Sequence, residues 1–146
     1  MNVKVIKLCE GARLPVYQSE SAAGADLFAL SGERIPPFGT ALIKTGLALE
    51  IPDGCVGLIC ARSGMALKRG LAPANKVGVI DSDYRGEIMV ALYNQSGSVQ
   101  EVLPGERIAQ LLIVPCIKAD FRESETLSET ARGEGGFGST GTGAEK

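Results

Sequence analysis

The chain has 146 residues, of which 45% are hydrophobic and 22% charged, so it has the size and composition of one globular domain. Its net charge of -2 lacks the basic excess that a nucleic-acid polymer or an anionic membrane attracts, so neither is an expected partner. There is no histidine, which excludes Ser-His and Cys-His nucleophile pairs and makes a carboxylate the first candidate for a general base.

Short apolar segments rich in β-branched residues recur along the chain, with Pro, Gly, Asn and Asp between them. They predict strands at residues 3–8, 25–30, 41–51, 55–61, 88–93, 99–103 and 108–117. Many short strands with frequent turn signals indicate an all-β sandwich or barrel. One segment, 63–70, favours a short helix of about two turns. Ser63 is its predicted N-cap, and Gly70 is predicted to end it.

The composition changes at residue 122, first to a polar and charged stretch and then to a glycine-rich one. No packed core can form there, so we expect a β domain over residues 1–121 and a mobile arm over 122–146. The arm carries a guanidinium, a ring and two hydroxyls among its glycines, at Arg132, Phe137, Ser139 and Thr140. These groups suit closure over a nucleotide, and a solvated tail is the alternative.

The segment 81–86 (DSDYRG) joins two apolar segments that are predicted to pair as a β-hairpin. A turn alone would not require the reactive and aromatic side chains found in this segment. Asp81 or Asp83 can act as a base, Tyr84 can pack flat against a sugar, and Asn75 just before the hairpin can read one edge of a nucleobase. The hairpin is therefore predicted to form a ligand pocket, with a bare turn as the alternative.

Three further segments offer ligand chemistry. Arg62, Ser63 and Gly64 lie at the predicted strand-to-helix junction, where free amides and a guanidinium can form an anion site. Asp26 follows small residues and can contact magnesium through water, because this ion commonly keeps its waters. Gln110 interrupts an apolar run, so it either faces water or has a partner. Helix capping, a turn aspartate and a structural glutamine are the respective alternatives.

Taken in order, five segments resemble the five motifs of the trimeric dUTP pyrophosphatase (dUTPase) family. They are 22–27 (AAGADL), 62–66 (RSGMA), 78–86 (GVIDSDYRG), 105–110 (GERIAQ) and 132–141 (RGEGGFGSTG). The resemblance therefore covers nearly the whole chain. One departure is Ala61, where the family usually has proline. We expect a subtle effect, because proline would stiffen the backbone there without adding a functional group.

The resemblance implies a jelly-roll-like β fold with one short helix, and a homotrimer with active sites between subunits. It also implies magnesium-dependent hydrolysis of dUTP to dUMP and pyrophosphate. That reaction limits uracil incorporation into DNA and supplies dUMP for thymidylate synthesis.

The resemblance also implies a role for each matching residue. Asp81 would activate the attacking water, Tyr84 would stack under deoxyribose, and Asp26 would contact magnesium through water. Uracil would be read by Asn75 and by the backbone at Gly78, Val79, Ile80 and Met89. The phosphates would contact Arg62, Ser63, Gly64 and Gln110. The arm would add Arg132, Phe137, Gly138, Ser139 and Thr140, with Phe137 over the uracil.

Two alternatives share this architecture. A dCTP deaminase needs a group that activates water at the base, usually a deep glutamate, and would release ammonia. A non-catalytic nucleotide-sensing module would bind without turnover. No apolar run approaches the roughly 18 residues of a spanning helix, and the first residues are no signal peptide, so a cytoplasmic location is expected.

Overall fold

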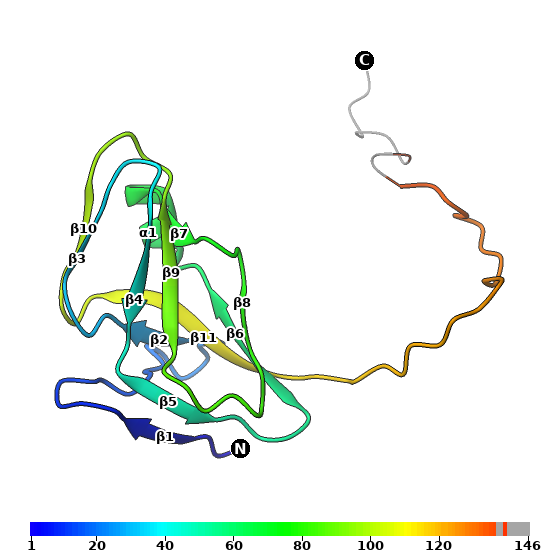
Figure 1. The fold of residues 1–146 in the computed structure, drawn as a ribbon, viewed down its shortest axis with the longest axis horizontal. Helices are drawn as coiled ribbons and strands as arrows, with labels where there is room; N and C mark the ends of the chain where they lie inside the picture. Colours follow the sequence, from blue (N-terminus) through cyan, green and yellow to red (C-terminus); the bar gives the residue numbers. More distant parts are fainter. Residues whose placement is uncertain (137–138, 140–146) are drawn as a thin grey trace.

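The computed structural model describes residues 1–136 and residue 139, and this part contains eleven short strands and one helix (Figure 1). The elements are β1 (Lys4–Lys7), β2 (Ala25–Phe28), β3 (Glu33–Ile35), β4 (Thr40–Lys44), β5 (Leu47–Glu50), β6 (Cys55–Cys60), α1 (Ser63–Arg69), β7 (Leu71–Pro73), β8 (Gly78–Ile80), β9 (Met89–Asn94), β10 (Gln100–Val102) and β11 (Arg107–Pro115). The prediction of an all-β fold with one short helix is confirmed.

The strands form two larger sheets and two strand pairs, and every pairing between named strands is antiparallel. The larger sheets have the orders β2-β11-β6-β8 and β4-β9-β7, and the pairs are β1-β5 and β3-β10. In Figure 1, β4 and β9 run side by side, and β11 passes between β2 and β6. The two ends of β6 therefore lie beside different loops, and the candidate site described below draws on both ends.

The core lies between the sheets and draws one face from each of them. Strand β9 shows the expected alternation, with Val90 and Leu92 buried and the residues between them partly exposed. Leu27, Ile59 and Leu111 supply the facing side from the other sheet. The same alternation turns the remaining residues of β6 and β11 outward.

The outward face of the β2-β11-β6-β8 sheet is apolar over β6, β8 and the second half of β11. Leu58 lies opposite Leu112, and Val56 lies opposite Val114, all four only partly buried. Val79 of β8 lies beside Leu58 and is 60% exposed. A contiguous apolar surface on a sheet is typical of a protein contact.

Two local expectations about this fold are wrong. The predicted strand 41–51 is divided into β4 and β5, because the chain bends at Gly46, which has a positive φ of 70°, and the two strands join different sheets. The helix begins after Arg62, which is extended (φ -92°, ψ 127°) and makes no side-chain cap, so Ser63 is the first helical residue. Gly70 ends the helix as predicted, with φ 66°.

The predicted β-hairpin around 81–86 is also wrong. Strand β8 pairs with β6, whereas β9 pairs with β4 and β7, so the two arms belong to different sheets. After β7, the chain stops pairing with β9 at Ala74, whose N–H donates to Ala91 O at 2.8 Å. Lys76 then turns it with a positive φ of 66° towards β6. Strands β8 and β9 therefore diverge, whereas the two strands of a hairpin would be hydrogen-bonded to each other.

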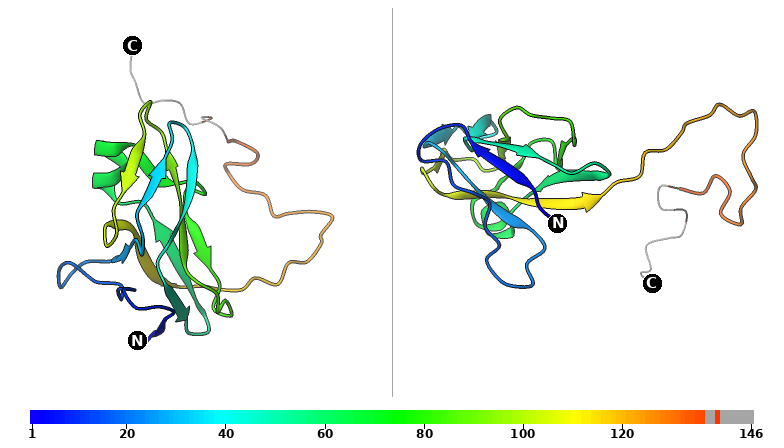
Figure 2. Two further views of the ribbon diagram at one scale, coloured as in Figure 1. Left: turned by 60° about the vertical axis from the view of Figure 1, so that its left-hand side comes forward. Right: turned by 90° about the horizontal axis from the view of Figure 1, so that it is seen from below.

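Among the described residues, the last strand ends at Pro115, and those that follow run away from the sheets (Figure 2). Residues 116–134 are exposed throughout. The division into a domain over 1–121 and a mobile arm over 122–146 stays a prediction. The one helix described is too short to cross a membrane.

Candidate active site

Three of the sequence motifs meet at one end of the β2-β11-β6-β8 sheet. Gln110 of β11 lies opposite both Asp26 of β2 and Cys60 of β6. Arg62, just beyond β6, donates from Nε to Asp26 Oδ1 at 2.9 Å. Gly24 leaves room for this arrangement, because a Cβ there would lie 3.1 Å from Gln110 Cβ. We name Asp26, Arg62, Gln110 and Arg107, described next, the cationic cluster.

Arg107 was missed by the sequence reasoning. Its Nη1 donates to Asp26 Oδ2 at 3.1 Å, so two arginines share one carboxylate that is 1% exposed. The pairing of β11 with β2 shifts register between Arg107 and Ala109. Strand alternation would have placed Arg107 on the face away from Gln110, and the bulge re-aims it. Two guanidinium groups on one carboxylate leave a surplus positive charge, which suits a phosphate.

Arg107→Ala should destabilise the protein by on the order of 1–3 kcal/mol, because it removes one of the two donors to a buried carboxylate. Urea unfolding measures this loss. Arg13→Ala is the matched control, since Arg13 stacks on Phe28 and donates to Gly105 O in the same region without touching Asp26. A loss in the control as large as that of Arg107→Ala would contradict the importance of the shared carboxylate.

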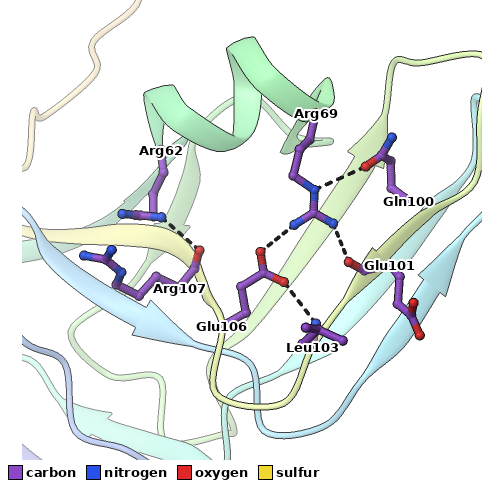
Figure 3. Close-up of polar contacts among 7 residues, drawn as sticks. All are labelled: Arg62, Arg69, Gln100, Glu101, Leu103, Glu106 and Arg107. Atoms are coloured by element: carbon purple, nitrogen blue, oxygen red, sulfur yellow. Dashed lines mark hydrogen bonds and ion pairs between the residues drawn. The ribbon is translucent and has the colours of Figure 1, made fainter.

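Helix α1 is fixed at both ends to the segment that runs from β10 to the start of β11 (Figure 3). At its start, Arg62 donates from Nη1 to Arg107 O at 3.2 Å. At its end, Arg69 forms an ion pair with Glu106, and its guanidinium also contacts Gln100 Oε1 and the Glu101 backbone carbonyl. These contacts hold Ser63 and Gly64, which are exposed in the first turn, beside the cationic cluster.

A pocket of about 210 Å³ opens between β8, the 81–88 connection and β9. Its lining residues are Leu42, Val79, Ile80, Asp81, Tyr84, Glu87 and Met89. We call it the nucleoside pocket. Strand β8 has a single neighbour, β6, so the N–H and C=O groups on its other edge are free to bind a ligand. Asn75 lies beside it, because a Cβ on Gly78 would be 3.4 Å from Asn75 Nδ2.

The two candidate bases differ in position. Asp81 lines the nucleoside pocket, whereas Asp83 lines a wider recess on the other side, which Asp81 also borders. The turn explains the difference, since Tyr84 N–H donates to Asp81 O at 3.1 Å and breaks the strand alternation. Asp81 is therefore better placed than Asp83 to act as a base on a ligand in the nucleoside pocket.

The far end of the 81–88 connection is anchored to the turn between β4 and β5. Buried Thr45 donates from Oγ1 to Ile88 O at 2.6 Å, and Gly46 N–H donates to Glu87 Oε1 at 2.8 Å. Ile88 N–H in turn donates to Leu47 O at 2.7 Å. Thr45 and Glu87 were not found from the sequence, since nothing in a polar residue near a turn distinguishes such an anchor from a solvated side chain.

The cationic cluster and Asp81 lie far apart within one chain. Ile80, directly before Asp81, pairs with Gly57 of β6, and Arg62 lies five residues beyond Gly57. Five extended residues span about 16 Å. A general base acts within about 3 Å of the proton it takes. Within a single chain the cationic cluster and Asp81 therefore lie near different ends of β6.

The dUTPase family model matches residues 10–141, which is most of the chain. This chain belongs to the dUTPase family. Curated relatives named deoxyuridine 5'-triphosphate nucleotidohydrolase include one from Picosynechococcus sp., 49% identical over 142 residues, covering 97% of this chain and all of the relative. Another, from Wolinella succinogenes, is 48% identical over 141 residues and covers 97% of this chain and 95% of the relative.

Solved dUTPase structures share the fold. A variant of the Staphylococcus bacteriophage 80alpha dUTPase with dUpNHpp has a TM-score of 0.91 and 30% identity, covering 97% of this chain and 99% of that one. A dUTPase variant from phage phi11 of S. aureus, whose structure concerns the coordination of a structural Mg(II) ion, has a TM-score of 0.79 and 28% identity. It covers 86% of this chain and 98% of the phage chain. The jelly-roll-like fold expected from the motifs is confirmed.

The described part of the fifth dUTPase motif, residues 132–136 and 139, lies in the segment that follows β11 and leaves the sheets (Figure 2). Arg132 donates from Nε to Gly135 O at 2.7 Å, and Ser139 N–H donates to Gly136 O at 3.0 Å, so both contacts are local. Phe137, Gly138 and Thr140 lie outside the described residues. The roles expected for the arm in this dUTPase-family chain stay predictions.

Proposed function

We propose that this chain hydrolyses dUTP to dUMP and pyrophosphate, and so limits the dUTP available for incorporation into DNA. The observation that carries the proposal is the nucleoside pocket, in which Asp81 and Tyr84 lie beside the free backbone edge of β8. Membership of the dUTPase family and relatives named for dUTP hydrolysis support the same substrate.

The pocket suggests how the nucleoside part binds. The pyrimidine lies between β8 and Met89, where backbone N–H and C=O groups of Gly78–Ile80 and the Asn75 amide pair with its edge. Tyr84 packs against the deoxyribose. Selectivity for uracil follows if the space between β8 and Met89 excludes the methyl group of thymine.

Asp81 then acts as the general base. Its carboxylate accepts a proton from a water molecule, and the oxygen of that water attacks the α-phosphorus. The bond from the α-phosphorus to the bridging oxygen breaks, and pyrophosphate leaves with that oxygen. Arg62, Ser63, Gly64 and Gln110 hold the phosphates, and the Arg62 guanidinium stabilises the negative charge that develops on them. Arm closure excludes other water.

The residues present fit a magnesium ion that arrives with the triphosphate. No group of three Asp, Glu or Cys residues capable of holding a metal occurs in the described part of the chain. Magnesium is commonly bound by substrate phosphates, water and one or two carboxylates. When bound, it neutralises phosphate charge. Each oxygen of Asp26 already accepts a bond from an arginine, so its main contribution here is to hold Arg62 and Arg107. Its contact with magnesium through water stays a prediction.

We also infer that the active site forms between subunits of a homotrimer. The separation of about 16 Å along the strand between the cationic cluster and the level of Asp81 supports an arrangement in which another chain supplies the phosphate contacts. The apolar outer face of the β2-β11-β6-β8 sheet offers a surface for that association. A cytoplasmic location, with neither nucleic-acid polymer nor membrane as partner, stays a prediction from the sequence.

Mixing two inactive variants tests the shared site. Asp81→Asn keeps the phosphate contacts, and Arg62→Ala keeps the nucleoside pocket, so a junction between the two chains can be intact. Joint refolding of equal amounts should restore about a quarter of the wild-type activity, because each mixed ring of three subunits contains one intact junction. Each variant refolded alone is the control. Activity no greater than the sum of these controls would place the whole site within one chain.

A substrate panel tests the activity itself. We expect pyrophosphate release from dUTP and much slower release from dTTP, dCTP and UTP. Light scattering measures the size of the assembly on the same protein. Ammonia from dCTP would instead identify a deaminase. Binding of dUTP without turnover would identify a nucleotide sensor.

A further inference from the structure

Tyr84 folds back over its own connection and rests on Gly86. A Cβ added at Gly86 would lie 2.6 Å from Tyr84 Cζ and 3.0 Å from Cε2, and closer still to the hydroxyl oxygen. Real Cβ atoms essentially never approach a heavy atom to within 3.0 Å. The hydroxyl also donates to Glu87 O at 3.1 Å. The ring position therefore depends on a residue that has no side chain.

The backbone around Gly86 is held from both sides. The turn from Asp81 to Tyr84 fixes the start of the connection, and the contacts of Glu87 and Ile88 with the turn between β4 and β5 fix its end. A side chain at Gly86 would therefore displace the ring more readily than the backbone. Tyr84 is 41% exposed, so its ring has space into which it can move.

We propose that Gly86 is a specificity-determining residue, which acts by providing the seat for the Tyr84 ring. This inference rests on the proposed function, in which the ring lies against the sugar. Rejection of a single 2′-hydroxyl requires a wall of the pocket to stay within a fraction of an ångström of its position. Gly86 permits that position, because a Cβ there would overlap the ring.

Gly86→Ala tests the proposal. The ratio of kcat/KM for dUTP to kcat/KM for UTP should fall by ~10-fold or more, a range typical of losing one steric contact in a pocket. Gly97→Ala is the matched control, since a Cβ there meets no atom within 4 Å, and it should leave the ratio unchanged. The thermal unfolding temperature of Gly86→Ala should stay close to the wild-type value, because Gly86 is exposed.

A double-mutant cycle tests whether Gly86 changes the substrate preference through the Tyr84 ring. If Gly86 acts through the ring, adding Gly86→Ala to Tyr84→Ala should change the ratio by less than about 2-fold beyond Tyr84→Ala alone. An unchanged ratio in Gly86→Ala, or an equal fall in both backgrounds, would overturn the proposal. Wild-type protein that released no pyrophosphate from dUTP would refute the proposed function instead, so the two failures are distinguishable.

Discussion

Asp81→Asn should slow dUTP turnover at least ~100-fold while dUTP binding stays close to the wild-type value, because asparagine keeps the shape of the side chain but cannot accept the proton from water. The chain has no histidine that could replace the lost base. Steady-state pyrophosphate release measures kcat, and calorimetry with the non-hydrolysable analogue dUpNHpp measures the dissociation constant.

Asp83→Asn is the matched control for this prediction. It makes the same chemical change two residues away, in a side chain that lines the recess outside the nucleoside pocket. We expect its kcat within about 3-fold of the wild type, as for a substitution that touches no reacting group. A wild-type rate in Asp81→Asn would reject Asp81 as the base, and an equal fall in both variants would indicate a shared effect of the turn.

Deleting residues 132–146 should lower kcat/KM for dUTP on the order of 100-fold, because it removes a guanidinium and the hydroxyls that are expected to stabilise the phosphates. In the described part of the chain the last strand ends at Pro115 and residues 116–134 are exposed, so we expect the core to keep its packing. The thermal unfolding temperature and the size of the assembly should therefore remain at their wild-type values.

Two variants sharpen the deletion experiment. Removing only residues 142–146, which lie beyond the family match, should leave activity intact. Arg132→Ala in the full chain should reproduce a large part of the loss. A fully active chain without residues 132–146 would refute closure of the arm, and a smaller assembly would show that the arm contributes to association instead.

Local patterns in the sequence predicted the elements far better than their partners. Alternation and turn residues predicted β6, β9 and β11, and Gly70 correctly predicted the end of the helix. The pairing of β8 with β6 could not be predicted in this way, because strand patterns carry no information about which strand lies alongside. The residue that redirects the chain, Lys76, is not one that normally adopts a positive φ.

The candidate site was predicted as a set of residues, but not as an arrangement. The pocket contains Asp81, Tyr84 and Met89 as expected. Arg107 was missed because a bulge changes the side of the strand on which it lies. The separation of the cationic cluster from Asp81 was invisible in the motif order, since it follows from the register of β8 on β6.

The divergence of β8 and β9 at the nucleoside pocket affects how ligand binding stabilises the whole molecule. One wall belongs to the sheet that contains β6 and the other to the sheet that contains β4, so a base bound between them would add a contact where β8 and β9 do not pair with each other. Occupancy should therefore restrain the relative movement of the two sheets, and slowed amide hydrogen exchange should spread into β4 and β6, well beyond the atoms that the ligand touches.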